Sequence, residues 1–216
     1  LQGKKEYLRA ADAFNNAYDL SGMLLYLANV AHCYLLAGDK EKAMKTLNIL
    51  ESNNVHEKGS LQARQVMAAV YSGIGRRDRA FDIYAGMSFD ELDPAGLEFL
   101  GAIHFKKGSM GIARKMFRRV TELNPSFPGG WNNAGVVEES AGNLESADSL
   151  YSKALELAPY YLDANFNRGN LFLKMGSEDS ALYYYRIADS LAGGRDAQIK
   201  EAIDNLESGS NRQSDD

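Results

Sequence analysis

The sequence predicts an all-α protein built as a solenoid of antiparallel helix pairs, and three regular columns of residues predict it. Alanines recur at intervals of 33, 37, 33, 34 and 34 residues, at Ala10, Ala43, Ala80, Ala113, Ala147 and Ala181. Five residues before the last five of them stand Gly38, Gly75, Gly108, Gly142 and Gly176. Four residues after each alanine comes Phe14, Leu47, Tyr84, Phe117, Tyr151 or Tyr185. Such long periods are typical of repeat architectures.

The glycine column predicts the turn between the two helices of each pair. Glycine at the end of a helix adopts left-handed backbone angles without a side-chain clash. The residue after each glycine is then expected to cap the second helix, and it is Asp39, Arg76, Ser109, Asn143 or Ser177. Four of these five are good N-caps, and each is worth about 1 kcal/mol.

A fourth column predicts how the two helices of a pair meet. Twelve residues before the alanines in the glycine-marked pairs, the chain carries Ala31, Ala68, Gly101, Gly135 and Gly169. Small side chains at this place let the paired helices approach closely. The aromatic column and the residue three positions further on lie on one face of the second helix, because their spacing matches the helical period.

The elements follow in chain order. Residues 4–18 are predicted to form the second helix of a half repeat, and five complete helix pairs begin near residues 24, 61, 94, 128 and 162. The insertion at residues 51–60 is predicted to be a longer connection. A capping helix at residues 196–207 closes a single solenoid domain over residues 1–207, because a solenoid end needs a polar outer face. Residues 208–216 are polar throughout and are expected to be disordered.

Composition limits the classes of function. With 216 residues, 45% hydrophobic and 25% charged, the chain has an ordinary globular composition. Its net charge of −5 and its short basic clusters argue against a nucleic-acid partner. No apolar run approaches the ~20 residues of a membrane span, so direct membrane insertion is not expected. The single Cys33 requires no oxidising compartment.

The localisation is left unknown by these features. The chain begins without Met and without a signal peptide, which indicates a piece of a longer polypeptide. The cytoplasm is the default expectation, and the periplasm or a larger membrane-anchored protein stays open.

The stretch from Pro128 to Pro159 is similar to a tetratricopeptide repeat. Its signature residues are Trp131, Ala134, Gly135, Gly142, Ala147, Tyr151, Ala154 and Pro159. The resemblance covers about residues 4–193. It implies a right-handed superhelix whose first helices line a concave groove, and a role in binding a peptide or a partner protein in that groove.

The resemblance also assigns candidate groove positions. The column of Asn133 reads Asn29, Val66, Phe99, Asn133 and Asn167, with Asn132 just before it and Asn170 three residues after Asn167. None of twenty candidate groove positions is Lys or Arg. A carboxylate clamp of the kind that holds a chaperone C-terminus would therefore lack its charge-assisted donors, and we reject it.

A second use of the groove resembles the helical domain of O-linked N-acetylglucosamine transferase, where an asparagine ladder holds the peptide main chain. A carboxamide offers both a donor and an acceptor. The peptide-binding set is therefore Asn29, Asn132, Asn133, Asn167 and Asn170, with Phe99 as an apolar floor. Two alternatives stay open: the asparagines bond between neighbouring helices, and Phe99 is partly buried core.

No residue set predicts a catalytic, cofactor or metal site. His32, His56 and His104 are far apart, and one cysteine makes no zinc set. His32 and Cys33 are adjacent on a helix, so they point about 100° apart and do not meet. There is no phosphate-binding loop.

These observations predict a non-catalytic protein–protein interaction scaffold. One alternative is the regulatory or substrate-recruiting arm of a larger enzyme or membrane protein. Another is a self-assembling structural subunit, because the unpaired first helix would expose Tyr7, Leu8, Phe14 and Tyr18 on one side.

Overall fold

The computed structural model describes residues 2–213, and every regular element in that part of the chain is a helix. The chain forms two compact units, Leu1–Leu100 and Gly101–Asp216. A single solenoid over residues 1–207 stays a prediction.

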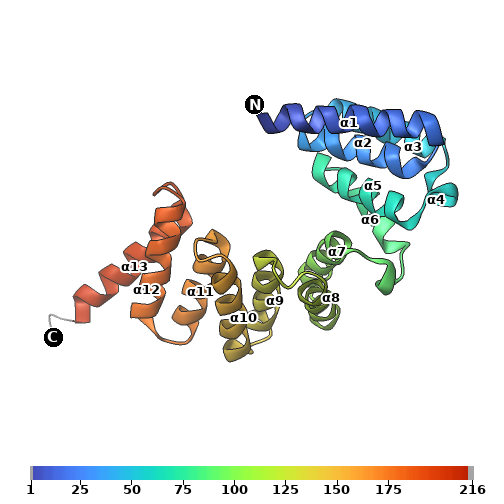
Figure 1. Ribbon diagram of the computed structural model, residues 1–216. Helices are drawn as coiled ribbons and strands as arrows, with labels where there is room; N and C mark the ends of the chain where they lie inside the picture. Colours follow the sequence, from blue (N-terminus) through green and yellow to red (C-terminus); the bar gives the residue numbers. More distant parts are fainter. Residues whose placement is uncertain (1, 214–216) are drawn as a thin grey trace. The chain divides into compact units, whose positions relative to one another are not determined.

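In the first unit, α2 is the central helix, because it contacts α1, α3 and α5 (Figure 1). The second helix of the next pair, α6, packs on α5. The elements of this unit are α1 (Gln2–Ser21), α2 (Leu24–Leu36), α3 (Lys40–Ser52), α4 (Val55–Lys58), α5 (Leu61–Ile74), α6 (Arg77–Ala85), the 3₁₀ turn η1 (Phe89–Glu91) and the first half of α7 (Pro94–Lys106).

In the second unit, from α8 to α13, each helix contacts the next, and α9 also contacts α11 across the stack (Figure 1). After the second half of α7 come α8 (Met110–Leu123), α9 (Pro128–Ser140), α10 (Leu144–Leu157), α11 (Leu162–Lys174), α12 (Glu178–Leu191) and α13 (Ala197–Gln213). The first helices of the five pairs thus begin at residues 24, 61, 94, 128 and 162, where the repeat columns predict them.

The turns inside the pairs confirm the role predicted for glycine. All five glycines have a positive φ, from 75° at Gly108 to 96° at Gly75. In each turn the next backbone N–H donates to a carbonyl five residues earlier, as Ser177 N does to Phe172 O at 2.9 Å. This Schellman arrangement satisfies the carbonyls at the end of the first helix.

The prediction of side-chain caps in these turns was correct only at Asp39, whose carboxylate accepts from the backbone N–H of Lys42 at 3.0 Å. Ser109, Asn143 and Ser177 make no such bond. The Asn143 carboxamide instead donates to Glu138 Oε2 at 2.7 Å, and the Ser177 hydroxyl bonds to that of Ser180. The side chains of Asn143 and Ser177 are thus occupied elsewhere, and the turns are held by their backbone.

In the last two pairs, close approach of the paired helices depends on glycine opposite tyrosine. A Cβ added at Gly135 would lie 2.6 Å from the Tyr151 ring, and one at Gly169 would lie 2.6 Å from the Tyr185 ring. Both tyrosines are fully buried. The hydroxyl of Tyr151 donates to Glu139 Oε2 at 2.6 Å. Burial and this carboxylate raise the pKa of the Tyr151 hydroxyl, so it stays a neutral donor.

Ion pairs join successive pairs in the second unit. Arg114 of α8 bonds Glu138 of α9 at 2.6 Å, and Asp148 of α10 bonds Arg168 of α11 at 2.7 Å. The Arg168 guanidinium also lies over the Tyr184 ring, 4.9 Å from its centroid. Each of these bonds therefore connects the second helix of one pair to the first helix of the next.

Two segments differ from the sequence prediction. The insertion at residues 51–60 contains the single-turn helix α4, because Val55 is fully buried and anchors it. Helix α13 continues to Gln213, whereas disorder was predicted from residue 208. No proline interrupts it, and the Ser208 hydroxyl donates to the Asp204 carbonyl at 2.6 Å. Residues 214–216 of the predicted tail lie outside the described residues.

Helix α1 is longer than the predicted 4–18, and its apolar side chains are less exposed than the sequence suggested. Leu8, Phe14 and Tyr18 are half-buried, and the Phe14 ring stacks on Tyr26 of α2 at 6.4 Å. Of the four residues named for self-association, Tyr7 alone is exposed, at 39%. Among the described helices, none is both long and apolar enough to cross a membrane.

Candidate functional site

Three of the predicted groove residues form one hydrogen-bonded chain across two helix pairs. Asn167 of α11 donates through Nδ2 to Asn132 Oδ1 of α9 at 3.0 Å. Asn132 in turn donates through Nδ2 to Asn133 Oδ1 at 3.4 Å. The carboxamides are thus connected side by side on the first helices of consecutive repeats.

Burial separates the roles of these asparagines. Asn132 links the two helices through its bond from Asn167. Because it is only 3% exposed, it is not available to contact a ligand. Asn133 and Asn167 are half-buried. Within residues 2–213, neither Asn133 Nδ2 nor Asn167 Oδ1 has a hydrogen-bond partner. The chain therefore presents one free donor and one free acceptor. For Asn132, the bond from Asn167 is of the kind that the alternative, bonding between neighbouring helices, describes.

Asn170 lies beside a cavity of about 360 Å³ between α11 and α13. Its Oδ1 accepts from the Tyr185 hydroxyl at 2.7 Å, which fixes the carboxamide. Phe166 and Leu173 supply apolar lining, and α13 adds Gln198, Glu201 and Asn205.

The three polar residues of α13 were missed by sequence reasoning, which treated that helix only as a cap. The signal was present in their i, i+3, i+7 spacing, which places them on one helix face.

The two remaining candidates lie in the first unit. Asn29 is half-buried on α2. Phe99 is 8% exposed, its ring packs 5.5 Å from that of Tyr84, and the Arg77 guanidinium lies 5.0 Å from its centroid. Phe99 is therefore core, as the alternative held, and it offers no open floor to a ligand.

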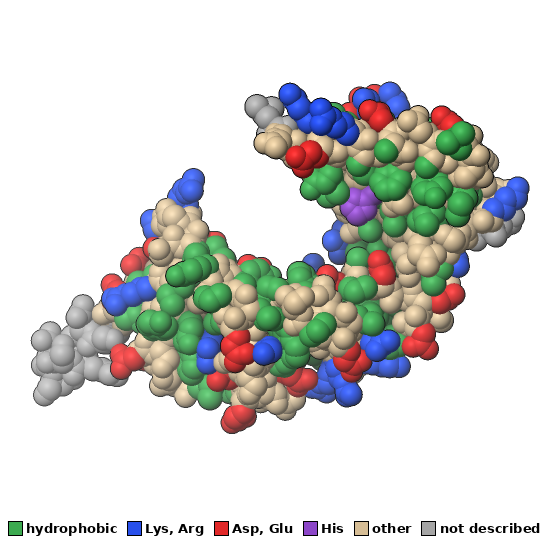
Figure 2. Space-filling model, in the orientation of Figure 1, with side chains coloured by type: hydrophobic (Ala, Val, Ile, Leu, Met, Phe, Trp, Pro, Cys, Tyr) green, Lys and Arg blue, Asp and Glu red, His purple; other side chains and the backbone are tan. Residues whose placement is uncertain are grey.

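The face shown in Figure 2 carries hydrophobic side chains over the middle of the second unit, with charged side chains along its lower edge. Among residues 2–213, no three His, Cys, Asp or Glu side chains gather as a metal-binding group. Burial raises the pKa of the Cys33 thiol and lowers that of the neighbouring His32. A reactive cysteine needs the opposite shift, so Cys33, which is buried, has the properties of a core residue.

Residues 100–161 match the tetratricopeptide repeat family. A curated relative, human protein O-mannosyl-transferase TMTC1, is 27% identical over 60% of this chain. The chain spans 15% of the length of that relative. Because the relative is named as a transferase, the absence of catalytic activity in this chain stays a prediction.

Two solved structures have the same fold. YrrB, described as a TPR protein with an unusual peptide-binding site, is 20% identical with a TM-score of 0.63, covering 91% of this chain and 99% of YrrB. The APC/C hetero-tetramer Cut9–Hcn1 is 19% identical with a TM-score of 0.71, covering 95% of this chain and 40% of the other. At these identities the likeness concerns the fold.

Proposed function

We propose that this chain is a tetratricopeptide-repeat protein and a non-catalytic interaction scaffold, which the match of residues 100–161 to that family and the likeness of fold to YrrB and Cut9–Hcn1 support. In this proposal the second unit binds an extended peptide segment of a partner protein along α9 and α11. The residues that contact the peptide are Asn133 and Asn167, with Asn170 beside them, and Asn132 positions the first two.

The observation that carries this proposal is a donor of Asn133 and an acceptor of Asn167 that are unpaired among the described residues and are held in place by the buried Asn132. An extended peptide main chain presents N–H and C=O groups in alternation. A fixed donor and a fixed acceptor satisfy such a main chain whatever its side chains are. YrrB, which shares this fold, has a peptide-binding site, and this gives independent support for a peptide ligand.

The cavity beside Asn170 supplies selectivity to this arrangement. It has an apolar floor at Phe166 and Leu173, and its only charged lining residue is Glu201. With no Lys or Arg among the lining residues, it disfavours a C-terminal carboxylate. The proposed ligand therefore passes through the groove as a chain segment and is not held by its terminus.

The test starts from a display library of random extended peptides, selected on the complete chain. The selected peptide is then titrated calorimetrically against the wild type and against Asn133→Ala/Asn167→Ala. Two lost main-chain bonds of about 1 kcal/mol each weaken binding roughly 30-fold. The control Asn16→Ala, on the exposed side of α1, leaves the affinity unchanged. Equal affinity of the double variant, measured at a temperature where it is still folded, would refute the groove assignment.

A second candidate function is the recruiting arm of a larger enzyme, and the similarity to TMTC1 favours it. In that arrangement the same groove brings a protein substrate to a catalytic domain elsewhere in the polypeptide. An antibody raised against this chain distinguishes the two candidates on immunoblots of the natural source. A product no larger than these 216 residues would contradict the recruiting-arm proposal.

A further inference from the structure

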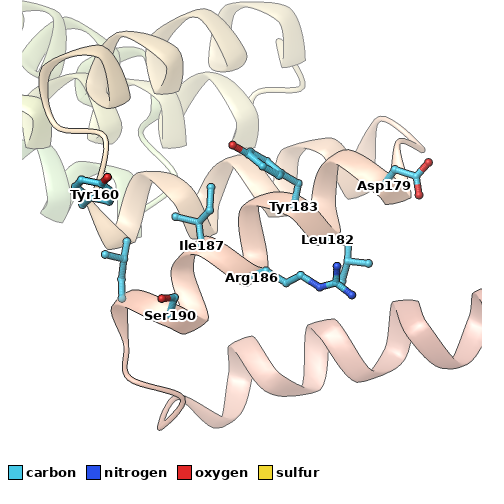
Figure 3. A pocket seen from close by; sticks show the side chains of 8 residues that line it. Tyr160, Asp179, Leu182, Tyr183, Arg186, Ile187 and Ser190 are labelled. Atoms are coloured by element: carbon cyan, nitrogen blue, oxygen red, sulfur yellow. The ribbon is translucent and has the colours of Figure 1, made fainter.

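A second surface, separate from the asparagine groove, lies on the outer face of α12. It is a cavity of about 570 Å³ whose apolar lining comes from Tyr160, Leu182, Tyr183, Ile187 and Leu191. Figure 3 shows Tyr160 at one end of the helix and Asp179 at the other, with the remaining side chains between them.

Comparison with the preceding repeats shows that this face is not needed to build a helix pair. The residues 34 positions before Leu182, Tyr183 and Ile187 are Asp148, Ser149 and Lys153. Those 68 positions before are Arg114, Lys115 and Arg119. The same fold is thus made twice with polar side chains at these places, and only α12 replaces all three with large apolar ones.

Part of the change is explained by the helix cap. Leu182 packs against the core cluster that α13 completes. At the corresponding position of the two preceding pairs, Arg114 and Asp148 instead make ion pairs to the following helix. Tyr183 has no such explanation, because it is 61% exposed. Exposed aromatic side chains in a cavity mark binding surfaces more often than isolated exposed ones.

The Tyr183 side chain is held in place before any partner arrives. Its ring packs edge-on against Tyr184 at 5.0 Å and 85°. Tyr184 in turn stacks on Phe172 of α11 at 5.5 Å and 9°. A rigid aromatic anchor loses little conformational entropy on binding, so this tyrosine is suited to contact a partner.

The dimensions and charges of the surface indicate what it binds. From Leu182 to Leu191 the apolar side chains follow about 14 Å of helix, bounded at one end by the Tyr160 ring. Arg186 is already paired with Glu207 of α13 at 2.8 Å. At the opposite end, the first turn of α12 carries Glu178 and Asp179, and Asp179 has no ion pair within residues 2–213.

We infer that this surface is a docking site for an amphipathic α-helix of a partner protein. The partner helix lies along α12, with apolar residues at i, i+3 or i+4, and i+7 packed on Tyr160, Tyr183 and Ile187. A Lys or Arg at one end of the partner helix meets Asp179. The site is independent of the asparagine groove.

The probes are two synthetic helical peptides of about 15 residues, long enough to span the surface. Both carry leucines at the helical spacing; one ends in two lysines and its twin in two glutamates. Fluorescence anisotropy with the complete chain measures binding. The basic peptide is expected to bind saturably and about tenfold more tightly than its acidic twin, a difference that an ion pair at a partly desolvated rim can supply.

The decisive variant is Tyr183→Ser/Ile187→Lys, which installs the residues that the preceding pair carries at Ser149 and Lys153. Because the fold already tolerates them there, the Tm is expected to hold while the affinity for the basic peptide falls at least about tenfold. Asp179→Lys reverses the preference between the two peptides. The matched control is Ser149→Ala/Lys153→Ala on α10, which leaves binding unchanged.

Three results overturn the inference: no saturable binding of either peptide, equal affinity of the Tyr183→Ser/Ile187→Lys variant, or binding lost in the α10 control. Analytical sedimentation tests for a fourth result that would overturn the inference. If the wild type is a dimer that Tyr183→Ser/Ile187→Lys converts to a monomer, the occupant is a second copy of this chain. Asn133→Ala/Asn167→Ala is expected to leave the peptide affinity unaltered, so failure of the groove proposal is recognised separately.

Discussion

Replacing Gly135 with alanine tests how closely the helices of a repeat pack. The added Cβ would lie 2.6 Å from Tyr151 Cε1 and 2.7 Å from Cδ1. The ring is fully buried and its hydroxyl is bonded to Glu139, so it has little room to move. Overpacking of this kind costs about 1 to 3 kcal/mol. Alanine in a helix returns up to about 1 kcal/mol relative to glycine, so we expect a net loss of about 1 kcal/mol.

The assay is thermal unfolding followed by circular dichroism. A loss of about 1 kcal/mol lowers the Tm by roughly 2 to 4 °C in a chain of this length. The matched control is Gly111→Ala in α8, where an added Cβ meets nothing within 4 Å. There the helix propensity acts alone, and the Tm is expected to rise.

A compensating change makes the test stricter. In the first complete pair, the corresponding positions are held by Ala31 and Leu47, so alanine and leucine are a combination that the fold accepts. Gly135→Ala is therefore expected to be much less harmful when Tyr151 is already leucine, with a coupling of about 1 kcal/mol or more in a double-mutant cycle. If Gly135→Ala raises the Tm as Gly111→Ala does, the close-approach reasoning is refuted.

Three further predictions concern stability. Asn132→Ala leaves the Asn167 carboxamide without its buried partner and is expected to destabilise the fold by about 1 to 3 kcal/mol; an unchanged urea midpoint would contradict the buried link. Gly142→Ala places a side chain at a φ of 82° and is expected to cost about 1 to 2 kcal/mol, measured in the same titration. Arg114 holds the pKa of the Glu138 carboxyl below its usual value, so the pair stabilises the fold above about pH 4.3, the unfolded value, and loses this contribution as the pH falls through the lowered folded value. Glu138→Gln is thus expected to lower the Tm at pH 7 by an amount equivalent to about 1 kcal/mol and to leave it unchanged near pH 3; an equal loss at both pH values would argue against the ion pair.

The repeat fold could be predicted because its determinants are local and recur. A glycine five residues before an alanine requires only a left-handed turn followed by a helix, and the observed φ values agree at every copy. Side-chain caps were less predictable, because their hydroxyl and carboxamide groups have competing partners. Asn143 illustrates this, since its carboxamide bonds Glu138 in the preceding helix.

The candidate site was predictable only in part. Asn132 and Asn133 are adjacent in sequence, and about 100° of helical rotation buries the first and leaves the second accessible. The spacing of the repeats does not predict this difference in burial between the two asparagines. The surface on α12 left a clearer trace, because the columns of Ser149 and Lys153 change to Tyr183 and Ile187. The depth of this surface depends on Tyr160, which comes from the loop between α10 and α11. No spacing rule predicts that this loop residue lies beside α12.

The backbone-held turns also have a practical consequence for handling this protein. Ser109 and Ser177 sit in turns whose geometry is fixed by glycine and by main-chain bonds, and neither side chain caps its helix. A cysteine introduced at either serine would carry a fluorophore or a surface tether without disturbing the helix start. The single native thiol, Cys33, is buried. Labelling would therefore be site-selective, and a label at Ser109 would leave both α9 and α12 free to meet their ligands, whereas Ser177 lies two residues from Asp179 of the α12 surface.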